Sequence, residues 1–67
     1  MRVQFVSLNG SHNLTIPEGT TISELENYVV IPDENLEFRV RGVEVDSGYN
    51  IQDGDMVVAT KKAKAGL

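Results

Sequence analysis

Residue types that carry catalytic or metal chemistry are sparse in this chain of 67 residues. The absence of cysteine removes thiol nucleophiles, disulfides and zinc-thiolate sites together. His12 is the single histidine, and no serine or second histidine is arranged with it, so general-base catalysis is not indicated. We expect His12 to be exposed beside a hairpin turn. The sequence therefore predicts a protein without catalytic activity of its own.

Asp53-Gly54-Asp55 is the one acidic motif that invites a metal interpretation. A calcium loop needs a longer ligand series and a distal glutamate, and both are missing here. Asp and Gly are also the residues that tight turns prefer. We therefore interpret the motif as a turn and predict no metal site and no cofactor.

Charge is divided unevenly along the chain. All ten acidic residues but only three basic ones lie in residues 1–60, giving that segment a net charge of −7. Nucleic-acid binding needs a basic face, so we expect neither nucleic acid nor membrane as a partner. The acidic surface serves solubility or steers a basic protein partner.

The basic residues Lys61, Lys62 and Lys64 are close together near the end of the sequence. Residues 1–60 contain no lysine at all. Two interpretations remain open for the three lysines: a strip that docks a protein partner, or a solvated tail. If this protein were attached to other proteins as a modifier, copies of it could not be linked to one another through lysines of residues 1–60.

Hydrophobic periodicity predicts five strands and one helix. Alternation in residues 1–8 and 13–16, joined by Asn9-Gly10, predicts an antiparallel hairpin. A capping box at Thr21 and Glu24 opens a helix expected to stop near Val30, before Pro32. The remaining strands are expected at 36–41, 43–45 and 56–59.

The order β-β-α-β-β-β predicts an α+β fold with one helix packed on one face of a mixed sheet of four to five strands. We expect the first and last strands to lie side by side and parallel, which is the β-grasp arrangement. The domain would span residues 1–60, followed by a flexible basic tail at 61–67.

Nearly the whole chain resembles ubiquitin and its prokaryotic relatives, the sulfur-carrier proteins of thiamine and molybdopterin synthesis. The segments that carry the ubiquitin resemblance are Met1–Gly10, Thr21-Ile22, Ile31-Pro32-Asp33, Tyr49-Asn50-Ile51-Gln52 and Lys62-Ala63-Lys64-Ala65-Gly66. Val40–Val45 and Asp53-Gly54-Asp55 are similar to the sulfur carriers. The resemblance is more specific for the fold than for the activity.

The resemblance implies chemistry at the C-terminus. In that family the carboxylate of a Gly-Gly pair is adenylated and then thioesterified or thiocarboxylated. Gly66 is the matching position here, with Ala65 before it and Leu67 after it. Glycine lets a tail thread a narrow enzyme channel, so activation at Gly66 is expected to require removal of Leu67.

The resemblance also implies a binding face. The apolar patch through which ubiquitin binds partners corresponds here to Leu8, Arg39 and Thr60, so its centre is charged, and Arg41 is a further candidate. This difference predicts different partners.

Two functions remain open: a carrier or modifier, with an activating enzyme or a deconjugating protease as partner, and a module that binds a protein through its sheet face without using the tail chemically. In both cases we expect a cytoplasmic monomer.

Overall fold

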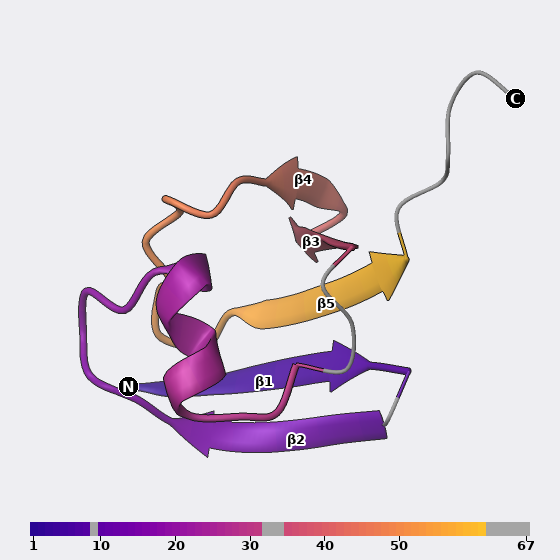
Figure 1. The fold of residues 1–67 in the computed structure, drawn as a ribbon. Helices are drawn as coiled ribbons and strands as arrows, with labels where there is room; N and C mark the ends of the chain where they lie inside the picture. The colour runs from indigo at the N-terminus through magenta and orange to yellow at the C-terminus, as the bar shows by residue number, and fades with distance from the viewer. Residues whose placement is uncertain (9, 32–34, 62–67) are drawn as a thin grey trace, which may run out of the picture.

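A computed structural model of the chain describes residues 1–8, 10–31 and 35–61. These residues form five strands and one short 3₁₀ helix (Figure 1). In chain order the elements are β1 (Arg2–Ser7), β2 (Gly10–Thr15), η1 (Ile22–Asn27), β3 (Leu36–Val40), β4 (Val43–Val45) and β5 (Met56–Lys61). The fold is therefore a small α+β structure dominated by its sheet. No helix in the described ranges is long and apolar enough to cross a bilayer.

The five strands form one mixed sheet in the order β2-β1-β5-β3-β4. β1 pairs antiparallel with β2 across the hairpin, from Arg2↔Thr15 to Ser7↔Gly10. β1 and β5 are parallel neighbours at the centre, with Val6 beside Val58. The predicted hairpin and the predicted parallel pairing of the first and last strands are both confirmed. Figure 1 shows β2 and β4 at opposite edges of the sheet.

The core lies on one side of the sheet. Phe5 of β1 and Val57 of β5 are fully buried, and Ala59 is nearly so. Alternate residues of a strand point to opposite faces, so the next residues along the strands, such as Val6 and Val58, point to the other side. Ile16, which directly follows β2, and Ile51, which precedes β5, complete the core from the connecting segments.

The helix contributes Ile22 and Leu25 to this core. Glu24 closes its first turn, because Glu24 Oε1 accepts a hydrogen bond from the backbone N–H of Thr21 at 3.0 Å. The first helical N–H groups also bond to the loop before β5: Ile22 N donates to the Tyr49 carbonyl and Ser23 N to the Ser47 carbonyl, each at 3.1 Å. The loop thus satisfies donors that a helix start leaves free.

The helix is shorter and tighter than the sequence predicts. It ends at Asn27 rather than near Val30, so Val29 lies beyond its end, where it is half-buried against the core. Short 3₁₀ segments are common where few residues must connect packed elements. β5 also runs to Lys61, one residue into the segment expected as tail.

Candidate functional site

The sheet face opposite the core, called here the open face, is the surface on which the predicted binding residues were expected. Strand register fixes its members, because directly paired residues lie on the same face. They are Arg2, Gln4, Val6, Ser11, Asn13, Thr15, Glu37, Arg39, Glu44, Met56, Val58 and Thr60.

Two of the predicted residues, Arg39 and Thr60, come together on the open face. Arg39 of β3 is directly paired with Val58 of β5, and Thr60 follows Val58 by two residues on β5. Leu8 directly follows β1, and 73% of its surface is exposed. Because β1 and β5 run in parallel, Leu8 and Thr60 lie toward the same end of the sheet.

The positive charge of Arg39 is neutralised within its own strand. Arg39 Nη2 lies 2.6 Å from Glu37 Oε2, and Arg39 Nε donates to the same oxygen at 2.9 Å. The two residues are separated by one position, so both point to the open face. The centre of this surface therefore carries an ion pair rather than an isolated charge.

An apolar strip crosses the open face beside this ion pair. Val6 and Val58 are directly paired and half-buried, and Met56 is 49% exposed. We call Val6, Met56 and Val58 the apolar strip. It offers a partner a small apolar contact bordered by polar side chains.

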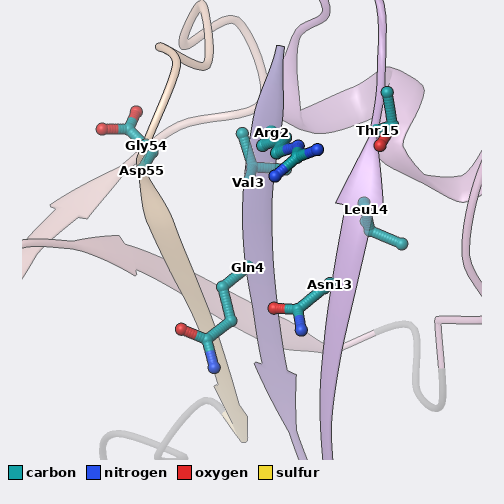
Figure 2. Close-up of a pocket in the computed structure, with 8 residues that line it drawn as sticks. All are labelled: Arg2, Val3, Gln4, Asn13, Leu14, Thr15, Gly54 and Asp55. Carbon is teal, nitrogen blue, oxygen red and sulfur yellow. The ribbon is translucent and has the colours of Figure 1, made fainter.

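A shallow depression of about 500 Å³ lies where β2, β1 and the start of β5 meet (Figure 2). Two cross-strand pairs of the hairpin form its polar lining: Arg2 is opposite Thr15, and Gln4 is opposite Asn13. In Figure 2 the Gln4 side chain lies toward β5 and the Asn13 side chain lies between β1 and β2. The sequence analysis did not identify this depression, because only the register of the hairpin reveals which polar residues lie opposite one another.

Arg41 belongs to a different cluster from Arg39. It lies in the β3–β4 turn with φ +54°, and its Nη2 donates to Asp55 Oδ1 at 3.1 Å. The Asp55 side chain is fully buried, whereas 76% of the Arg41 side chain is exposed. The structure thus separates Arg39 and Arg41, which the sequence grouped as one binding face, into two clusters.

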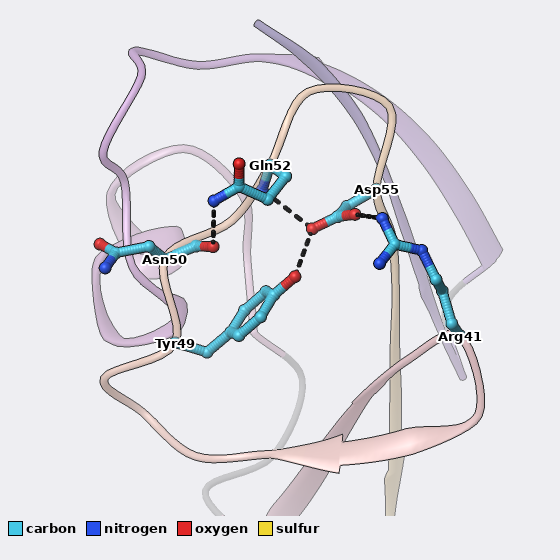
Figure 3. A network of polar contacts seen from close by, with 5 residues as sticks. All are labelled: Arg41, Tyr49, Asn50, Gln52 and Asp55. Carbon is cyan, nitrogen blue, oxygen red and sulfur yellow. Dashed lines mark hydrogen bonds and ion pairs between the residues drawn. The ribbon is translucent and has the colours of Figure 1, made fainter.

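Asp55 is the centre of a hydrogen-bond network that ties the loop before β5 together (Figure 3). Its Oδ2 accepts from the Tyr49 hydroxyl and from the backbone N–H of Gln52, both at 2.8 Å. The Gln52 side chain in turn donates to the Asn50 carbonyl at 3.0 Å. A buried carboxylate is costly unless several donors satisfy it, and here three donors do so.

The network changes the acidity of Tyr49. Its hydrogen bond to Asp55 raises the pKa of the phenol above the ordinary value of 10.0, and burial and the negative charge of Asp55 act in the same direction. Arg41 opposes these effects. The phenol is thus held as a hydrogen-bond donor to Asp55 Oδ2.

Asp53 lies in the turn before β5 and ties this turn to β1, since its Oδ1 accepts a hydrogen bond from the backbone N–H of Arg2 at 2.8 Å. Across the described ranges, no group of three histidine, aspartate or glutamate side chains is placed to hold a metal ion. His12 lies on β2 directly opposite Phe5 of β1, and it is exposed.

The tail predictions fall mostly outside the described residues. Lys61 ends β5 and is exposed. Lys62, Lys64 and Gly66, with Ala65 and Leu67, lie beyond the described ranges, so their predicted roles stay predictions.

Comparison with known proteins gives no assignment for this surface. The chain matches no protein-family model, and a search of curated proteins finds no significant relative.

Proposed function

We propose that this chain is a non-catalytic, ubiquitin-like carrier or modifier of the cytoplasm, with a β-grasp fold. In this proposal the helix packs across the core face of the sheet. Hydrolysis removes Leu67, and the freed carboxylate of Gly66 reacts with ATP on a partner enzyme to form an acyl-adenylate with release of pyrophosphate. The acyl group then passes to sulfur or to an amine with release of AMP. The chain acts as a monomer and supplies no catalytic group itself.

The observation that carries the proposal is the strand order β2-β1-β5-β3-β4 with parallel central strands. This order matches the β-grasp expectation, and it places β5 beside β1 in the middle of the sheet. β5 ends at the exposed Lys61, so the basic sequence Lys62–Gly66 follows directly from a strand anchored by Val57 and Ala59. A rigid sheet joined to a glycine-containing segment suits delivery of a carboxylate to another protein's active site.

Exchange of radioactive pyrophosphate into ATP tests the chemical step. Each adenylating enzyme encoded in the same genome would be incubated with three versions of the chain, comprising residues 1–65, 1–66 and 1–67. We expect exchange with 1–66 alone, since Leu67 blocks the reacting carboxylate and 1–65 ends on a residue with a Cβ. Equal exchange with all three versions, or none with 1–66, contradicts the carrier proposal.

A second candidate, an interaction module, is supported by the open face. The apolar strip lies next to the Arg39–Glu37 ion pair, and a small apolar contact with a polar border is a common form of protein interface. A version ending at Thr60 distinguishes the two functions. An interaction module keeps its affinity for the partner in a pull-down from the native host, whereas a carrier loses its adenylation.

A further inference from the structure

Arg2 differs from the other arginines of the described ranges in its electrostatic surroundings. Arg39 is paired with Glu37 and Arg41 with Asp55, whereas the guanidinium of Arg2 has no carboxylate partner among the described residues. Its backbone is nevertheless fixed on both sides. Its N–H donates to Asp53 Oδ1 and its carbonyl accepts from Gly54 N, each at 2.8 Å. Arg2 thus presents an exposed guanidinium from an anchored backbone, on a protein with a net charge of −4.

Neutral hydrogen-bonding groups lie beside this cation in the depression of Figure 2. Thr15 is directly opposite Arg2 across the hairpin, and Asn13 is directly opposite Gln4. Gln4 Nε2 donates to Ser11 Oγ at 2.6 Å, which uses one of its two N–H groups and leaves the other available. The depression therefore combines one positive charge with amide and hydroxyl donors.

The carboxylates on either side of Gly54 do not occupy this cation. Asp55 is enclosed in the network with Tyr49, Gln52 and Arg41, and its side chain is fully buried. Figure 2 shows its carboxylate directed away from Arg2. Asp53 uses one oxygen for the backbone of Arg2.

We propose that this depression binds a carboxylate group. The Arg2 guanidinium forms the ion pair, and the side chains of Asn13, Gln4 and Thr15 supply neutral donors. A guanidinium presents parallel N–H groups that match a carboxylate. A monoanion is favoured over a phosphate dianion, because the net charge of −4 repels a second negative charge more strongly. This site lies in the sheet and does not depend on the proposed chemistry at Gly66.

The carboxylate has two sources, a free small acid and an acidic side chain of an extended peptide. β2 is an edge strand of the sheet that the described residues form, and an edge strand presents backbone N–H and C=O groups to a further strand. A peptide added there would carry its side chains next to Asn13 and Thr15. A peptide that uses both the edge and the cation binds more tightly than a free acid.

NMR titration of the ¹⁵N-labelled full chain tests the proposal. The probes are sodium acetate, a blocked tripeptide with a central glutamate between two valines, and the same tripeptide with glutamine. Sodium chloride at equal ionic strength is the control for screening. We expect saturable shifts of the Arg2 Nε–H and of the Asn13 and Gln4 side-chain amides with acetate and with the glutamate peptide. The glutamine peptide should bind more weakly.

Arg2→Gln and Arg39→Gln form a matched pair of variants. Each removes one positive charge, but only Arg2 lines the depression. We expect Arg2→Gln to weaken carboxylate binding about tenfold or more, the usual effect of losing a charge-assisted hydrogen bond. Arg39→Gln should leave it unchanged. The amide spectrum of each variant reports directly whether it is folded.

The source is decided by comparing the two carboxylate probes. Tighter binding of the glutamate peptide, with backbone shifts along β2, identifies an acidic peptide, and equal affinity of the two identifies a free acid. The proposal is overturned if acetate produces no more shift than chloride. Equal weakening by the two arginine variants also overturns it, because the effect would then come from net charge alone.

Discussion

Arg39 and Arg41 are two residues apart and both meet a carboxylate, yet the two ion pairs differ in what they can contribute. The Arg39–Glu37 pair lies on the open face, where the side chains are 44% and 18% exposed. The Arg41–Asp55 pair joins a largely exposed guanidinium to a carboxylate with no exposed surface. The comparison teaches that the burial of the acid, rather than the distance between the charges, determines the energetic weight of each pair. Four substitutions test it.

Asp55→Ala is expected to have the largest effect. It leaves the Tyr49 hydroxyl and the Gln52 N–H without their acceptor, so we expect a loss of about 3 kcal/mol in the free energy of unfolding. Urea denaturation measures it. Glu37→Ala is the matched control, since it also removes one carboxylate of an ion pair. Similar losses in the two variants would contradict the comparison.

Tyr49→Phe is expected to cost about 1–2 kcal/mol near neutral pH, because it removes one donor to a buried carboxylate. The raised pKa of Tyr49 adds a pH dependence. The stabilisation by the protonated phenol is complete below the unfolded pKa of about 10 and is lost as the pH rises through the higher folded value. Urea midpoints measured from neutral to alkaline pH should decline more steeply in the original chain than in Tyr49→Phe. Parallel declines would exclude this role for Tyr49.

Arg41→Gln should lower the free energy of unfolding by less than Asp55→Ala or Tyr49→Phe. We expect a loss of about 0.5–1 kcal/mol, because solvent screens the exposed guanidinium. The buried carboxylate keeps its hydrogen bonds from Tyr49 and Gln52. Thermal unfolding at low and high salt would measure the loss. An effect as large as that of Asp55→Ala would show that Arg41, rather than the neutral donors, stabilises the buried charge.

Arg39→Gln is expected to change the free energy of unfolding by no more than about 0.5 kcal/mol, the usual value for a surface pair. Added salt should reduce even this difference, since screening is effective for exposed charges. If Arg39→Gln lowered the free energy of unfolding by more than Arg41→Gln does, independently of salt, the Arg39–Glu37 pair would be the more stabilising of the two.

The sequence predicted the sheet better than it predicted the surface. Alternation of apolar and polar residues depends on burial alone, so the pattern in residues 1–8 predicts the first strand correctly, and Val3 and Phe5 are buried in it. The helix was predicted too long, because its last turn depends on tertiary contacts that periodicity does not contain.

The Asp55 network could not be predicted beyond a turn at Asp53-Gly54-Asp55. Its donors come from two separate segments of the chain, the β3–β4 turn with Arg41 and the loop before β5 with Tyr49 and Gln52. The same reason applies to the depression at Arg2, where cross-strand register decides the neighbours. Local patterns thus give the strands, while sites assembled from distant segments require the coordinates.

The central position of β5 also governs when this protein can fold during synthesis. β5 is made after the other four described strands, yet it joins the β2-β1 hairpin on one side to β3 and β4 on the other. Until it leaves the ribosome, the two halves of the sheet have no strand between them, and Phe5 lacks its neighbour Val57. Pairing of segments far apart in the chain forms slowly. We therefore infer that the nascent chain remains without its core until β5 has been made.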